Sequence, residues 1–88
     1  MKVKEGFVLR NVATSWVIVA VGKASTIFKG VIELNETSKF LFSKMLEGKF
    51  SKDSLTDALL DEYEVNKNEA ARDVSEFIDR LKGIGVIE

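Results

Sequence analysis

The junction at residues 31–37 constrains the fold of this chain more than any other stretch. Its apolar residues close a predicted strand over residues 27–34, and Asn35 is suited to cap a helix that begins at Glu36. Almost no loop separates the two elements, so a strand-rich half of the chain runs directly into a helical half. Gly30, within the predicted strand, indicates a bulge or the close approach of another backbone.

Periodicity in the rest of the chain predicts two earlier strands and three helices. The strands are expected over residues 7–12 and 16–21. The second of these is apolar on both faces, which is typical of a central strand. The helices are expected over residues 36–46, 52–63 and 67–82.

The ends of the predicted helices carry recognisable signals. Ser51 and Asn66 are suited to N-cap the second and third helices, and Gly83 is expected to end the third. The apolar tail at residues 86–87 is expected to return to the core. This order of elements predicts an α+β fold of winged helix-turn-helix type, with a three-stranded antiparallel sheet followed by three helices in one domain over residues 1–88.

The composition excludes several classes of function. The chain has no cysteine and no histidine, so it has no disulfide, no thiolate metal site and no His- or Cys-centred catalytic group. It has no glycine-rich phosphate-binding motif. No apolar run is long enough to cross a bilayer, and the N-terminus does not resemble a signal peptide. We therefore expect a cytoplasmic protein that is not an enzyme and has no cofactor, metal or membrane partner.

The charge is divided unevenly between the two halves of the chain. Residues 1–44 carry seven Lys/Arg and three Asp/Glu, whereas residues 45–88 carry six and eleven, and the net charge is −1. A winged-helix regulator that binds DNA is the obvious structural alternative. However, its second and third helices would present acidic or balanced faces to phosphates, which does not favour nucleic-acid binding.

A small sheet with an open edge offers a different function, the capture of an extended peptide as an added strand. Phe77 and Ile78 differ by about 100° around the third helix, so one can face the core while the other lines a groove. The residues alone leave equally open that both are core and the edge is merely exposed. The candidate peptide-binding residues are Lys29, Gly30, Val31, Ile32 and Glu33 on the edge and Arg72, Asp73, Glu76, Phe77 and Arg80 on the facing helix.

Two further expectations concern the open edge of the predicted third strand. Lys29, in the basic half of the chain, favours an acidic peptide. An open edge can also pair with a second copy of itself, so the chain is expected to be a monomer or a weak homodimer.

Several short segments, taken in order, resemble PqqD-like proteins. They are Leu34-Asn35-Glu36-Thr37, residues 73–81 and Gly85-Val86-Ile87. The resemblance implies a recognition element that binds the leader of a ribosomally made precursor peptide. The leader would add beside the third strand, against the third helix, and be presented to a modifying enzyme, often a radical S-adenosylmethionine enzyme.

The sequence departs from that family pattern in two places. Ser38 stands where the family usually has glycine, at the start of a helix. The segment 22–29 is longer than in the proteins of pyrroloquinoline quinone synthesis. This difference favours a relative that serves another modified-peptide pathway.

Overall fold

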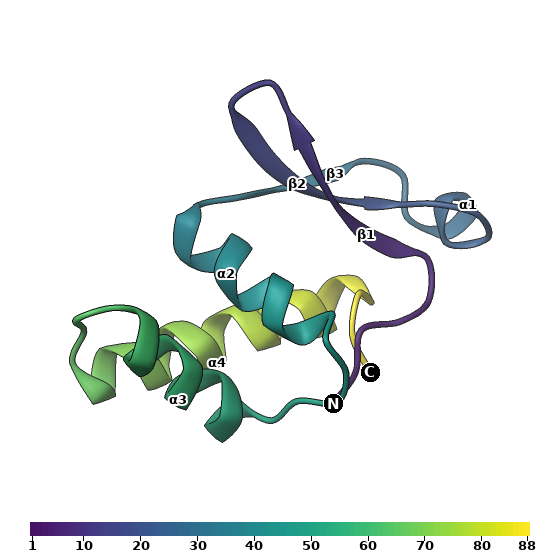
Figure 1. Ribbon diagram of the computed structural model, residues 1–88. Coiled ribbons are helices and arrows are strands. Elements are labelled where there is room, and N and C mark those ends of the chain that lie inside the picture. Colours follow the sequence, from purple (N-terminus) through teal and green to yellow (C-terminus); the bar gives the residue numbers. More distant parts are fainter.

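A three-stranded antiparallel sheet lies over three of the four helices in the computed structural model, which describes residues 1–88 (Figure 1). The α+β arrangement expected from the sequence is confirmed. The strands are β1 (Phe7–Val12), β2 (Ser15–Ala20) and β3 (Val31–Leu34). The helices are α1 (Ala24–Ile27), α2 (Glu36–Met45), α3 (Lys52–Glu62) and α4 (Lys67–Ile84). No helix is both long enough and apolar enough to cross a membrane.

The strand order is β1-β2-β3, so β2 is central, as its two apolar faces predict. A two-residue turn joins β1 to β2, with Val12 opposite Ser15 and Ala13 in the left-handed region at φ 56°. Ile18 pairs with Ile32 and Trp16 with Leu34 across β2 and β3. Beyond β2, β3 has no neighbour, and its outer side is an open edge.

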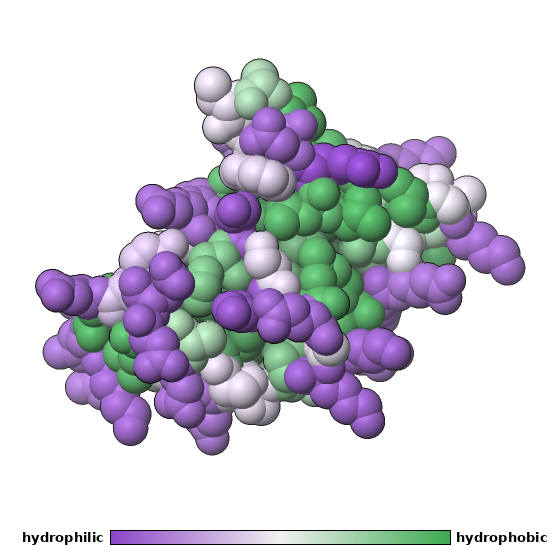
Figure 2. All heavy atoms as spheres, in the orientation of Figure 1, coloured by the Kyte–Doolittle hydropathy of each residue, from purple (hydrophilic) through white to green (hydrophobic).

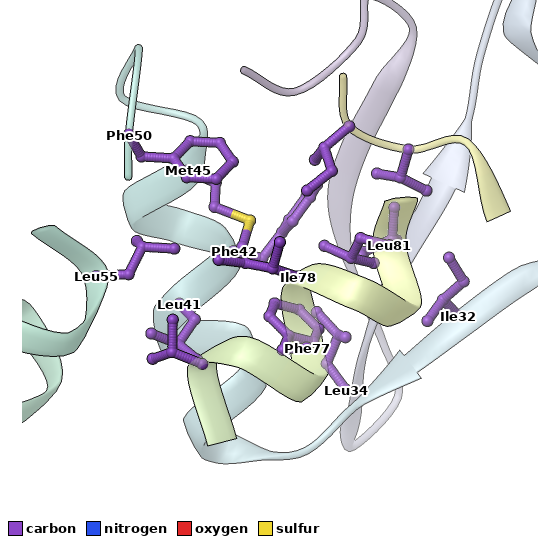
Figure 3. Packing of buried hydrophobic residues seen from close by; sticks show 14 of the residues in the cluster. Ile32, Leu34, Leu41, Phe42, Met45, Phe50, Leu55, Phe77, Ile78 and Leu81 are labelled. Atoms are coloured by element: carbon purple, nitrogen blue, oxygen red, sulfur yellow. The ribbon is translucent and has the colours of Figure 1, made fainter. Parts of the chain in front are cut away.

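One face of the sheet supplies the core, and the helices cover it. Ile18, Ile32 and Leu34 point from the strands into a single buried cluster with residues of α2 and α4. Figure 3 shows Phe77 and Leu81 of α4 projecting toward Leu34 and Ile32 of β3. Each such side chain stabilises the fold by about 1.5–3 kcal/mol when it is fully buried.

The three predicted N-caps are confirmed. The side-chain oxygens of Asn35, Ser51 and Asn66 accept backbone N–H groups of the first helical turns at 2.8, 3.0 and 2.8 Å. The predicted stop at Gly83 is wrong, because α4 continues to Ile84 and ends at Gly85. Gly85 has φ 83°, and this left-handed conformation, which Gly83 does not have, is what closes the helix.

The predicted strand over residues 27–34 is wrong in its first half. Residues 24–27 form the one-turn helix α1, and residues 28–30 lie outside any element. The hydroxyls of Ser25 and Thr26 donate to the carbonyls of Gly22 and Lys23 at 2.6 and 2.7 Å, which stabilises this turn. Gly30 has φ 141° and open space where a Cβ would lie, so it ends the turn region rather than forming a bulge.

The tail at residues 86–87 returns to the core as expected. Val86 and Ile87 are buried, and Ile87 forms an isolated antiparallel bridge with Val3. The Lys4 N–H donates to the Val86 carbonyl at 2.9 Å. Both ends of the chain therefore lie together beneath the sheet, beside the end of α4 (Figure 1).

The fold predicts that alanine substitutions at two glycines cause different losses of stability. An added Cβ at Gly6, where φ is 97°, would lie 2.7 Å from the Ala24 Cβ and 3.0 Å from the Val21 carbonyl oxygen. At Gly22, where φ is 62°, it would meet nothing within 4 Å. Gly6→Ala should therefore lower the free energy of unfolding by about 2–4 kcal/mol, and Gly22→Ala by only about 1–2 kcal/mol.

Urea denaturation of the two variants and the unsubstituted protein measures this contrast. Equal losses at the two positions would contradict the packing of α1 against the start of β1.

Candidate functional site

The open edge of β3 exposes an identifiable set of backbone groups. The Val21 N–H donates to the Gly6 carbonyl at 2.7 Å, so at this end of the sheet the odd-numbered residues of β2 bond to β1. Bonding direction alternates along an antiparallel strand, so the even-numbered residues Trp16 and Ile18 bond to β3. Their partners Leu34 and Ile32 therefore turn their N–H and C=O groups inward, toward β2.

The outward-facing backbone groups of β3 belong to Val31 and Glu33. Each offers one N–H and one C=O on the side away from β2. Their side chains lie on the outer face of the sheet, where Val31 is 62% exposed and the Glu33 carboxylate accepts a long hydrogen bond of 3.4 Å from the Ser15 hydroxyl. Neither side chain pairs with the backbone of the edge, so the edge is free to accept another strand.

A cleft of about 340 Å³, here called the α4 cleft, lies between the first turn of α2 and the middle of α4. It starts at Asn35, directly after the last residue of β3. Its floor is apolar, formed by Leu41 and Phe77, and its rim is polar. The lining residues are Asn35, Thr37, Ser38, Leu41, Asp73, Glu76, Phe77 and Arg80.

The structure brings together four of the five candidate residues on the facing helix. Asp73, Glu76, Phe77 and Arg80 all line the α4 cleft, whereas Arg72 is exposed and lies outside its lining. Helical spacing explains the difference, because Asp73, Phe77 and Arg80 fall within an arc of about 60° on one side of α4, and Arg72 projects about 100° from Asp73.

The candidate residues on the strand side are placed less uniformly. Val31 and Glu33 offer outward backbone groups, whereas Ile32 is buried and its backbone faces β2. Lys29 and Gly30 are exposed but precede the strand. The edge is therefore shorter than the sequence predicts.

Sequence reasoning missed the contribution of α2 to the cleft. Asn35, Thr37, Ser38 and Leu41 line it from the first turns of that helix. The signal was present in the junction at residues 31–37, because a helix that begins one residue after an edge strand must place its first turn beside the end of that edge.

Phe77 and Ile78 are both buried, with exposed fractions of 6% and 4%. Of the two, only Phe77 reaches the lining of the cleft. Phe77 therefore has two roles, since it packs against the core and also forms the floor of the cleft.

The charged side chains of the cleft have no partners within the protein. Asp73, Glu76 and Arg80 are exposed and form none of the hydrogen bonds or ion pairs of the structure; its ion pair is Lys44–Glu47 at 3.6 Å, at the end of α2. Together the three carry a charge of −1 at the rim. Their charges are available to a ligand without the loss of an internal contact.

The chemistry of this site is that of binding a chain. It combines outward N–H and C=O groups, an apolar floor and a charged rim, and no group of three His, Cys, Asp or Glu side chains is placed to hold a metal ion.

Elsewhere, at the end of α3, partial loss of hydration and then the carboxylates of Glu36 and Glu62 raise the pKa of Tyr63.

Comparisons with known proteins agree with this arrangement. The family model described as "Coenzyme PQQ synthesis protein D (PqqD)" matches residues 15–87. The solved structure described as "TbiB1 in Complex with the TbiA(beta) Leader Peptide" is similar with a TM-score of 0.78 and 22% sequence identity, over 100% of this chain and 95% of that chain. No curated protein matches the sequence. At this identity the solved structure shows a shared fold.

The site predicts that its rim and its floor differ in their effect on stability. Arg80→Ala should change the free energy of unfolding by less than about 0.5 kcal/mol, because the exposed guanidinium has no internal partner. Phe77→Ala should cost about 3–5 kcal/mol, because it removes a buried ring from the core. Chemical denaturation measures both, and a loss above about 1.5 kcal/mol for Arg80→Ala would assign Arg80 a structural role.

Proposed function

The chain belongs to the PqqD family, and from this premise we propose that it binds the leader segment of a ribosomally made precursor peptide. The leader adds as a strand to the open edge of β3 and lies against α4. The observation that carries this proposal is the free backbone edge of Val31 and Glu33 beside the α4 cleft. The similar fold of TbiB1, which is described in complex with a leader peptide, supports it.

Main-chain pairing supplies the part of the affinity that does not depend on sequence. The outward groups of Val31 and Glu33 can form up to four hydrogen bonds with an added strand. Each contributes about 0.5–1.5 kcal/mol net, so the edge alone gives weak binding. Specificity must come from side chains of the leader that alternate along the added strand and enter the α4 cleft.

The α4 cleft selects the side chains that enter it. Phe77 and Leu41 offer an apolar floor, and Asp73 and Glu76 offer carboxylates to a basic residue of the leader. Lys29 lies just before the edge rather than in the cleft. In this proposal the acidic rim of the α4 cleft favours a basic residue of the leader, and an acidic residue is favoured near Lys29.

The role that follows is presentation rather than catalysis. The domain holds the leader so that the rest of the precursor reaches a modifying enzyme, which in this proposal is a radical S-adenosylmethionine enzyme. The longer segment between β2 and β3 favours a precursor other than that of pyrroloquinoline quinone. Strand addition uses the same edge as self-pairing, so leader binding would compete with any dimer formed through β3.

Replacing one backbone donor tests strand addition directly. Glu33→Pro removes an outward N–H and leaves the hydrogen bonds to β2 intact, and proline is tolerated at such edge positions. Glu33→Thr removes the same carboxylate and keeps the N–H. We expect Glu33→Pro to weaken leader binding about tenfold and Glu33→Thr to change it by less than about threefold.

The measurement is calorimetric or fluorescence titration with a synthetic leader peptide that binds the unsubstituted protein. Circular dichroism of both variants controls for folding. Equal binding by the folded Glu33→Pro and Glu33→Thr variants would remove strand addition from the proposal.

A further inference from the structure

A second and larger cleft lies at the other end of α4. It has a volume of about 760 Å³ and is mostly apolar, and it is here called the α1 cleft. It lies between α1, the start of β1 and the end of α4. Its main apolar residues are Phe7, Val21, Ala24, Ile27, Phe28 and Ile84.

The α1 cleft gathers several apolar side chains that the fold leaves exposed. Ile27 is 88% exposed, and Val21 and Ile84 are each 39% exposed, although all three line the same cleft. In Figure 2, hydrophobic surface gathers between the sheet and the helices and extends toward α1. A contiguous exposed patch of this kind marks a binding surface more often than a scattered apolar residue does.

Internal contacts hold the walls of this cleft together. The rings of Phe7 and Phe28 meet edge to face with their centroids 6.0 Å apart. The Phe28 N–H donates to the Ala24 carbonyl at 2.9 Å, and Ala24 packs so closely on Gly6 that a Cβ there would clash. Ile27 therefore projects from a turn that packs against the sheet.

The two clefts lie along one side of α4. Asp73, Phe77, Arg80 and Ile84 fall within an arc of about 60° around the helix, since they are spaced by four, three and four residues. The first three line the α4 cleft beside the end of β3, and Ile84 lines the α1 cleft with Phe28, just before β3 begins. A chain that lies between β3 and α4 therefore passes from one cleft toward the other.

The spacing matches an extended peptide. Phe77 and Ile84 are seven residues apart on α4, which is about 10.5 Å along the helix axis. An extended strand covers that distance in about three residues. Side chains on one face of a strand repeat every second residue, so a leader residue over Phe77 and another two or four positions further along can occupy the two clefts at the same time.

The charges of the two clefts are opposite. Asp73, Glu76 and Arg80 give the α4 cleft a charge of −1, whereas Lys4, Lys23 and Glu5 give the α1 cleft a charge of +1. Complementarity then favours a basic residue of the peptide at the α4 cleft and an acidic residue at the α1 cleft.

We propose that the α1 cleft is a second subsite for the peptide that pairs with β3, and that it takes a large apolar side chain beside a carboxylate. This inference rests on the proposed function and adds the order in which charged residues follow one another along the peptide. The peptide carries a cation at the α4 cleft and an apolar residue with an adjacent Asp or Glu at the α1 cleft.

Peptide display tests the subsite without a known ligand. The probe is a library of random peptides of about twelve residues, long enough at about 3.3 Å per residue to span both clefts. Selection is performed on the full chain, and the selected peptides are then titrated against four variants. These are Ile27→Asn, Ile84→Asn, Leu46→Asn and Glu33→Pro.

We expect selected peptides to share a Lys or Arg separated by a few residues from a large apolar residue next to Asp or Glu. Ile27→Asn and Ile84→Asn should each weaken binding about tenfold, because they remove apolar contact in the α1 cleft. Leu46→Asn is the matched control, since Leu46 is 43% exposed and lines neither cleft. It should leave binding unchanged.

The outcomes separate the subsite from the proposed function. Binding that is lost in Glu33→Pro but kept in both isoleucine variants overturns the subsite and leaves strand addition standing. Binding lost in the isoleucine variants but kept in Glu33→Pro overturns the link between the α1 cleft and β3. If Glu33→Pro weakens the binding of none of the selected peptides, the proposed function itself is overturned.

Discussion

Burial of Ile32 and Leu34 against α4 determines how this molecule presents its edge. Side chains alternate along a strand, so fixing these two on the inner face places Val31 and Glu33 on the outer face. The register with β2 then directs the backbone groups of Val31 and Glu33 away from the sheet. A slip of one residue would expose two core side chains and reverse the pattern of the edge, so the core and the site depend on the same contacts.

The site combines groups that the fold does not need. The outward backbone groups of β3 have no strand beside them, and the charged residues of the α4 cleft have no internal partners. An unused sheet edge carries a risk of self-association, and natural proteins limit it by keeping such strands short and flanking them with charges. β3 has four residues, and Lys29 and Glu33 supply charges before and within it. The edge is therefore short and flanked by charges, yet its outward backbone groups have no partner in the sheet.

Local signals in the sequence were enough to predict most of the architecture. The apolar pattern of residues 16–21 identified the central strand to within one residue, and Asn35, Ser51 and Asn66 located the three helix starts. The helix predicted over residues 67–82 supplied four residues of the α4 cleft, because helical spacing alone places Asp73, Phe77 and Arg80 together. Signals of this kind depend on neighbours within one element, and a single sequence contains them.

What the sequence could not provide depends on contacts between distant residues. Ile27 and Phe28 have the composition of a strand, but residues 24–27 form α1, and Ala24 of this turn lies against Gly6, far away in the sequence. The α1 cleft depends on the same contact, so the sequence alone did not predict it. The roles of Ile32 and Glu33 could be separated only once the bond from Val21 to Gly6 fixed the direction of the ladder.

Amide hydrogen exchange at the four residues of β3 tests the central claim most directly. In the free protein, the amides of Ile32 and Leu34 should be protected, and those of Val31 and Glu33 should exchange rapidly. Saturation with a leader peptide that binds the protein should slow exchange at Val31 and Glu33 until all four are protected. Rapid exchange at Val31 and Glu33 in the saturated complex would contradict strand addition at this edge.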